Sequence, residues 1–157
     1  MLEWEIKGEV TPEELRKRFE EYKDDPGRLR TMVIDYLMPY MVAEILRANA
    51  DAMTKAQAIF YLGELYGALD GLSRLVSRLT RGTGSYEELK ESYEFIYEYI
   101  MRTATDRLID LYEGLKKGWP LNDIKETLKN LASDVEFGSF EYDVGPIVRL
   151  IRKQKPS

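Results

Sequence analysis

The segment from Ala52 to Thr80 carries the longest uninterrupted helical pattern in the chain. Six of its apolar residues follow one another at spacings of 3, 4, 3, 4 and 3: Leu62, Leu65, Leu69, Leu72, Val76 and Leu79. This spacing places all six on one side of an α-helix, as in helical bundles and coiled coils. A rod with one apolar edge needs other helices to cover that edge, so the sequence predicts a mainly α-helical bundle.

The opposite side of this predicted helix carries glycine at three positions, Gly63, Gly67 and Gly71. An internal glycine costs a helix about 1 kcal/mol relative to alanine, so three of them indicate a compensating contact. Small residues four apart let another backbone approach closely. We expect the neighbour to be the second helix of the same chain. The alternatives are a second copy or a different protein, and then a nucleic-acid strand or a small ligand.

Phe60 lies on the glycine side of the helix, and Arg74, Arg78 and Arg81 continue that side toward the carboxyl end. The three arginines are about one turn apart, and residues 71–85 contain no acid. Like charges in such a row repel unless an anion lies beside them. Glutamates at positions 87–98 would supply it within the chain, and phosphates would supply it from outside because guanidinium groups bind phosphate bidentately. The sequence favours the first interpretation and leaves the second open.

Two further helices are expected before position 50. Thr11, followed by Pro12, has the residue types of a helix start, and this helix should end near residue 24. The largely apolar run 28–49 predicts a central helix with a kink at Pro39, since proline lacks the donor for the preceding turn. Asp35 lies in this run. A buried functional acid is one interpretation of it, and a salt-bridged or half-exposed acid is the favoured one.

Two more helices are expected after position 84, over residues 85–117 and from 121 or 122 to about 133. The first of these has two apolar sides. Tyr86, Tyr93 and Tyr97 share the side of its aliphatic residues and are expected in the core. Phe95 and Tyr99 point elsewhere together with Arg102, so we interpret these three as part of a contact surface.

Period-two alternation at the two ends of the chain predicts strands. Residues 1–10 alternate apolar with charged side chains, and residues 135–144 alternate around Gly138 and Ser139, as in a β-hairpin. Because a lone hairpin is rarely stable, the amino-terminal strand is expected to join it in a small antiparallel sheet. The predicted organisation is a single domain over 1–157, with a helical body at 12–133, a β appendage at 1–10 and 134–152, and a basic tail at 153–157.

The composition argues against most kinds of catalysis. The chain has no cysteine and no histidine, which excludes disulfides, thiolate nucleophiles, the usual zinc sites and imidazole proton transfer. No phosphate-binding loop or carboxylate metal cage is recognisable. We therefore expect no enzymatic activity, no cofactor and no metal.

The charge and apolar content narrow the range of partners. A net charge of -5 argues against general binding to nucleic acid or anionic membranes, and no apolar run is long enough to span a bilayer. The first residues lack a secretory signal, so we expect a cytoplasmic protein.

Asparagine and glutamine number five in total, a bias typical of hyperthermophiles. A second candidate anion contact is the basic end of the chain, with Arg149, Arg152 and Lys153.

These observations predict a non-catalytic helical subunit that assembles with another protein and touches a nucleic-acid backbone through its arginine row. The alternative is a protein-only adaptor, an inhibitor or a homo-oligomeric structural protein. In outline, a helical body with a β appendage and a basic stripe is similar to the small non-catalytic subunits of archaeal nucleoprotein assemblies, including CRISPR effector complexes. That resemblance is one of architecture and rests on no motif.

Overall fold

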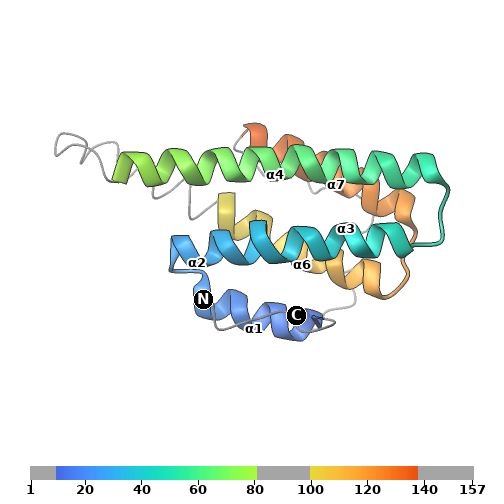
Figure 1. Cartoon of the computed structure of the whole chain (residues 1–157), viewed down its shortest axis with the longest axis horizontal. Helices are drawn as coiled ribbons and strands as arrows, with labels where there is room; N and C mark the ends of the chain where they lie inside the picture. Colours follow the sequence, from blue (N-terminus) through green and yellow to red (C-terminus); the bar gives the residue numbers. More distant parts are fainter. Residues whose placement is uncertain (1–9, 81–99, 138–157) are drawn as a thin grey trace.

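The computed structural model describes residues 10–80 and 100–137, without the side chains of residues 26, 73, 75–80 and 137. The elements in chain order are α1 (Pro12–Tyr22), α2 (Pro26–Arg30), the π-helical segment η1 (Thr31–Leu37), α3 (Met38–Arg47), α4 (Ala52–Thr80), α6 (Arg102–Lys116) and α7 (Leu121–Phe137). Because α2, η1 and α3 follow one another without a break, the described chain forms five helical rods (Figure 1).

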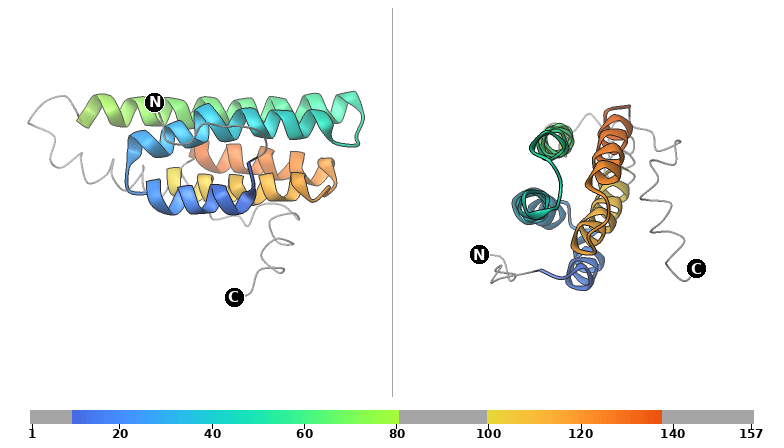
Figure 2. Two further views of the ribbon diagram at one scale, coloured as in Figure 1. Left: turned by 60° about the horizontal axis from the view of Figure 1, so that its bottom comes forward. Right: turned by 90° about the vertical axis from the view of Figure 1, so that its right-hand side faces the viewer.

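The rods pack in two layers around a shared core. Seen end-on, α4 and α3 lie in one layer, α7 and α6 lie in the other, and α1 lies beside α6 (Figure 2). One hydrophobic cluster joins all of them. Ten of the 15 residues of α6 are buried, so α6 is the most enclosed of these helices. The rod that contains α3 is open on one side, where Asp35, Pro39 and Leu46 are exposed.

The predicted start of α1 is confirmed. The Thr11 hydroxyl accepts a hydrogen bond of 3.1 Å from the Glu14 backbone N–H, and Pro12 occupies the first turn, where its missing donor costs nothing. The helix ends at Tyr22, slightly before the expected position. Asp25 then caps α2 by accepting a bond of 3.2 Å from the Arg28 N–H.

Pro39 is accommodated by a change of helix type. The turns before it are π-helical, and the Met38 N–H bonds to the carbonyl of Val33, five residues back. A π turn is wider than an α turn, so it gives the proline ring room beside a carbonyl group with which it clashes in a regular helix. The sequence predicts a kink at Pro39, and the structure has the π-helical segment Thr31–Leu37 directly before α3, the helix that contains this proline.

The α4 helix has the bounds that the sequence predicts, Ala52–Thr80. Its first turn is capped by Asp51, whose carboxylate accepts a bond of 2.7 Å from the Thr54 N–H. Along its inner side Leu62, Leu65 and Leu69 are buried, and Leu72 is partly buried against the same core. The predicted apolar edge is thus confirmed as far as Leu72, because Val76 and Leu79 have side chains outside the described set.

Gly118 ends α6 with a positive φ of 75°. The Trp119 N–H bonds to the carbonyl of Gly114 and the Gly118 N–H to that of Leu115, at 3.0 and 3.2 Å. This pair of bonds is the Schellman motif, which needs a left-handed residue that glycine adopts without strain. The tight turn reverses the chain so that α7 begins at Leu121.

The predicted antiparallel sheet is wrong for the part of the chain that the structure describes, residues 10–80 and 100–137, which contains no strand. Val135, assigned to the first strand of the hairpin, lies within α7, which continues to Phe137. Its side chain is 7% exposed and belongs to the core. Val135 follows Leu128 and Leu131 at helical spacing, so burial on one side of a helix explains its apolar character. The remainder of the proposed sheet, 1–9 and 138–152, lies outside the described residues.

Within the described residues, none of the helices is both long and apolar enough to cross a membrane.

Candidate interaction surface

The outer side of α4 is the most exposed apolar surface among the described helices. Figure 2 shows α4 at a corner of the end-on view, with α3 and α7 as neighbours. Three of the four large apolar residues that are exposed in the described chain lie on α4: Met53 is 71% exposed, Phe60 62% and Tyr66 42%. The fourth is Leu46, near the end of α3, at 56%. Isolated exposed apolar residues are common, but several on one helix indicate an interaction site.

The three glycines lie open on this outer side. A Cβ atom added to Gly63, Gly67 or Gly71 would meet no heavy atom of the described chain within 4 Å. The expected neighbour, the second helix, does not cover them, although α3 and α4 pack against each other. The glycines therefore have no packing role within the described fold that would offset their cost to the helix.

A second heptad-like row runs along α4 opposite the core. It consists of exposed small or apolar residues at spacings of 3, 4, 3, 4 and 4: Met53, Ala56, Phe60, Gly63, Gly67 and Gly71. We call these six residues the outer row. Met53 was missed by the sequence analysis, although it precedes Phe60 by one heptad. The first four spacings match those of the buried edge and the last is 4 instead of 3, so α4 has the pattern of a helix with packing partners on two sides.

Arg74, at the end of the outer row, is held by an acid of its own helix. Its guanidinium contacts the Asp70 carboxylate at 3.1 Å, yet its side chain remains 68% exposed. The same carboxylate binds Arg30 of α2. Asp70 is thus shared by two arginines, so this group of three carries net positive charge. Within the described chain the acid beside Arg74 is therefore Asp70, four residues earlier. The glutamates at positions 87–98, which the sequence favoured for this role, lie outside the described residues.

The other predicted contact residues are distributed differently. Arg102 donates hydrogen bonds to the Lys23 carbonyl at 3.0 Å and to the Asp24 carboxylate at 2.6 Å, so it joins α6 to the end of α1. Arg102 therefore belongs to the contact between α6 and α1 and not to the outer side of α4. The following residues have side chains outside the described set: Arg78, Arg81, Phe95, Tyr99, Arg149, Arg152 and Lys153.

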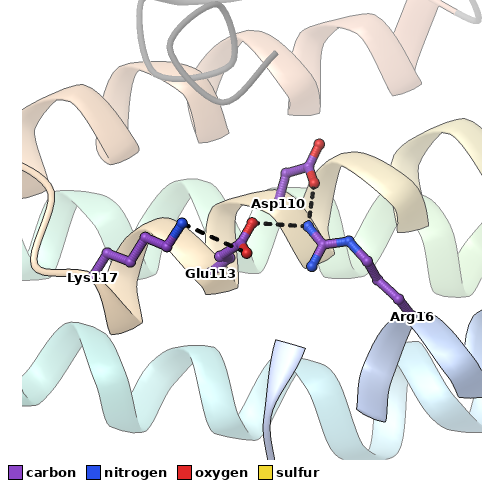
Figure 3. Close-up of polar contacts among 4 residues, drawn as sticks. All are labelled: Arg16, Asp110, Glu113 and Lys117. Carbon is purple, nitrogen blue, oxygen red and sulfur yellow. Dashed lines mark hydrogen bonds and ion pairs between the residues drawn. The ribbon is translucent and has the colours of Figure 1, made fainter. Parts of the chain in front are cut away.

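A partly buried group of charges lies between α1 and α6 (Figure 3). Arg16 of α1 contacts Asp110 at 2.6 Å and Glu113 at 3.0 Å, and Lys117 approaches Glu113 at 3.8 Å. The side chain of Asp110 is 6% exposed. Burial lowers the pKa of Arg16, but the hydrogen bond to Asp110 and the attraction of both carboxylates outweigh it, so the pKa of Arg16 is raised.

This arrangement is structural in character. Both carboxylates are engaged by cations from inside the fold, and the guanidinium takes up acceptor positions that a substrate or metal would need. Asp35, for which the sequence left open a role as a buried functional acid, is exposed. That interpretation is therefore wrong. Among residues 10–80 and 100–137, no group of three or more acidic side chains is placed to hold a metal ion.

Comparison of the chain with protein-family models, with curated proteins and with solved structures finds no match.

Proposed function

We propose that this protein is a non-catalytic interaction subunit that binds a partner protein through the outer row of α4. The observation that carries the proposal is the pair of helix sides on α4. One side is buried against α7 and α3, and the other, with a similar spacing, has glycines in open space next to Phe60.

Energetics support an outside partner. Each exposed glycine lowers helix stability by about 1 kcal/mol relative to alanine, and an exposed phenylalanine forgoes the gain of about 1.5 to 3 kcal/mol that burial provides. Neither residue type is explained by contacts within the described part of the chain. A helix laid along the outer row would approach closely at the glycines and would bury Phe60, so it would offset both costs.

Contact with a nucleic-acid backbone is a second candidate, favoured by the exposed Arg74 and by the net positive charge that it shares with Arg30 and Asp70. Arginine binds phosphate without reading sequence. Such binding would weaken steeply with salt, whereas burial of apolar surface would not. Arg78 and Arg81 would extend the same contact.

Photo-cross-linking at the outer row tests the main proposal. A photo-reactive phenylalanine derivative replaces Phe60 in the full chain, and the purified protein is irradiated in an extract of its source cells. We expect one discrete cross-linked polypeptide, identified by mass spectrometry. The matched control carries the derivative at Asn122, an exposed position at the start of α7, and is expected to give none.

The cross-linked partner is then purified, and its dissociation constant is compared for the wild type and for Phe60→Asp. Loss of binding in the variant, with an unchanged helical spectrum, supports the proposal. Equal cross-linking at both positions, no cross-linked product, or unchanged affinity of Phe60→Asp would contradict it.

A further inference from the structure

The glycines of the outer row are arranged symmetrically about Gly67. Gly63 lies four residues before it and Gly71 four residues after it. Phe60 lies seven residues before Gly67, and Arg74 lies seven residues after it. All five residues are exposed on one side of α4. A surface with this symmetry is complementary to a copy of itself that runs in the opposite direction about a two-fold axis at Gly67.

The three glycines alone do not indicate which molecule packs against them. Phe60 and Arg74, the residues at the two ends of the glycine row, favour a second copy of the chain. In the antiparallel arrangement Gly67 meets Gly67 of the partner subunit, and Gly63 meets Gly71 of the partner subunit. Phe60 then lies opposite Arg74 of the partner subunit, and the same contact repeats on the other side of the axis. The absence of side chains at the centre lets the backbones approach closely, while the large residues meet at the ends.

Charge complementarity favours this orientation over the parallel one. Arg74 is 68% exposed and Phe60 62% exposed, and a guanidinium is attracted to the face of an aromatic ring. In a parallel pair Arg74 would lie against Arg74 of the partner subunit, and like charges repel. Antiparallel pairing also sets the positive end of each helix beside the negative end of the other.

We propose that the partner of the outer row is a second copy of this chain, and that the protein forms a two-fold symmetric dimer through antiparallel α4 helices with the axis at Gly67. This inference rests on the proposed function, because it names the partner of the same surface.

Single-cysteine cross-linking tests the dimer directly, because the chain has no cysteine of its own. The three full-length variants are Gly63→Cys, Gly67→Cys and Gly71→Cys, and all three positions have open space for a side chain. Under mild oxidation Gly67→Cys is expected to form a disulfide dimer. Each of the other two alone is expected to form about tenfold less, since their thiols lie apart across the axis.

An equal mixture of Gly63→Cys and Gly71→Cys, one of them carrying a tag, is expected to form the mixed dimer. Equal homodimer formation by all three single variants would show a parallel pair and overturn the proposal. Absence of any disulfide dimer would overturn it as well, provided that light scattering of the wild type also gives the mass of a monomer.

A second pair of variants guards against disturbance by the thiol. Gly67→Leu is expected to convert the wild-type dimer to a monomer with an unchanged helical spectrum, and Asn122→Leu on α7 is the matched control that stays dimeric. A monomeric wild type that still cross-links to another polypeptide through position 60 would refute the dimer and leave the proposed function standing. A dimer that Gly67→Leu does not affect would refute this inference.

Discussion

Gly114 in α6 and Gly67 in α4 are both internal residues of a helix, but they differ in what surrounds them. A Cβ atom on Gly114 would lie 2.7 Å from Cε3 of Trp119, whereas one on Gly67 would meet nothing of the described chain within 4 Å. The fold itself accounts for the first glycine, because Trp119 is packed against it. For the second, the described fold provides no such contact, which agrees with the proposal of an outside partner.

The same contrast extends to the helices that carry them. The described part of α6 is enclosed by core residues and by the ionic contacts of Arg16, while the outer side of α4 is open and apolar. The enclosed side chains of α6 contribute to the stability of the fold, whereas we assign the exposed side of α4 to the binding of a partner. Substitutions in the two regions should therefore act on different measurements.

The largest effect is expected from opening the enclosed region with Arg16→Met. This change keeps much of the side-chain length but removes the cation from Asp110, which is 6% exposed, and from Glu113. We expect a loss of about 3 kcal/mol in the free energy of unfolding, the lower end for a broken buried pair, because Arg16 itself is partly exposed. Denaturant unfolding of the wild type and the variant measures this loss of free energy.

Arg18→Met is the matched control on the same helix, since Arg18 pairs with the exposed Glu21 at 3.3 Å. Its loss should stay below about 1 kcal/mol. Similar losses in the two variants would show that enclosure of the carboxylates does not determine the stability of this region.

A smaller effect, with opposite signs in the two regions, is expected from adding one methyl group. Gly67→Ala should raise the free energy of unfolding of the monomer by about 1 kcal/mol, since it gains helix propensity in open space. Gly114→Ala should lower it by about 1 to 3 kcal/mol, because the Trp119 ring has to move. Both are measured at protein concentrations low enough for the monomer to predominate.

The propensity gain is common to both variants, so the difference between them isolates the contact with Trp119. If both substitutions stabilise the protein to the same extent, the ring yields at no cost and the contrast between the two glycines fails.

The smallest effect concerns the pH dependence of Asp134, whose side chain is 6% exposed and lies 3.8 Å from Arg107. Burial raises the pKa of Asp134 above 3.8, and Arg107 opposes this only in part. Because the folded pKa exceeds the unfolded one, the folded state binds the proton more tightly. Stability contributed by this group is present below pH 3.8 and is lost as the pH rises through the folded pKa.

Asp134→Asn removes this titration, so the variant should gain stability relative to the wild type between about pH 3 and pH 7. Unfolding in denaturant at several pH values gives the difference. The altered contact with Arg107 shifts the free energy of unfolding of the variant by the same amount at every pH, because arginine stays charged throughout this range. A difference that does not vary with pH, or that falls as the pH rises, would contradict the raised pKa.

Local signals in the sequence were sufficient for some elements. Thr11 and Pro12 begin α1 as predicted, and the bounds of α4 are those of its periodic pattern, because capping and amphipathicity are properties of short segments. The misassigned strand at Val135 has the same origin. Two or three alternating apolar residues are too few to indicate a strand, because in a helix they can lie on different sides; Val135 continues the row of Leu128 and Leu131 along α7.

The neighbours of each helix side were harder to predict. Periodicity shows that α4 has two sides, but which element covers a side depends on long-range packing, and α3 was expected over the glycines. The bond between Arg30 and Asp70 spans 40 positions, so no local pattern indicates it. The contact of Asp70 with Arg74 joins residues four apart, a spacing at which opposite charges on a helix meet, so this pair is a local signal in the sequence.

The π-helical segment before Pro39 has a further consequence for the charged end of α4. A π turn holds more residues than an α turn, so it alters the rotational phase of every residue that precedes it relative to every residue that follows. Arg30 is the last residue of α2, immediately upstream of this segment, and α3 is downstream. The accommodation of one proline thereby sets the direction in which Arg30 points, and with it the meeting of two cations at Asp70.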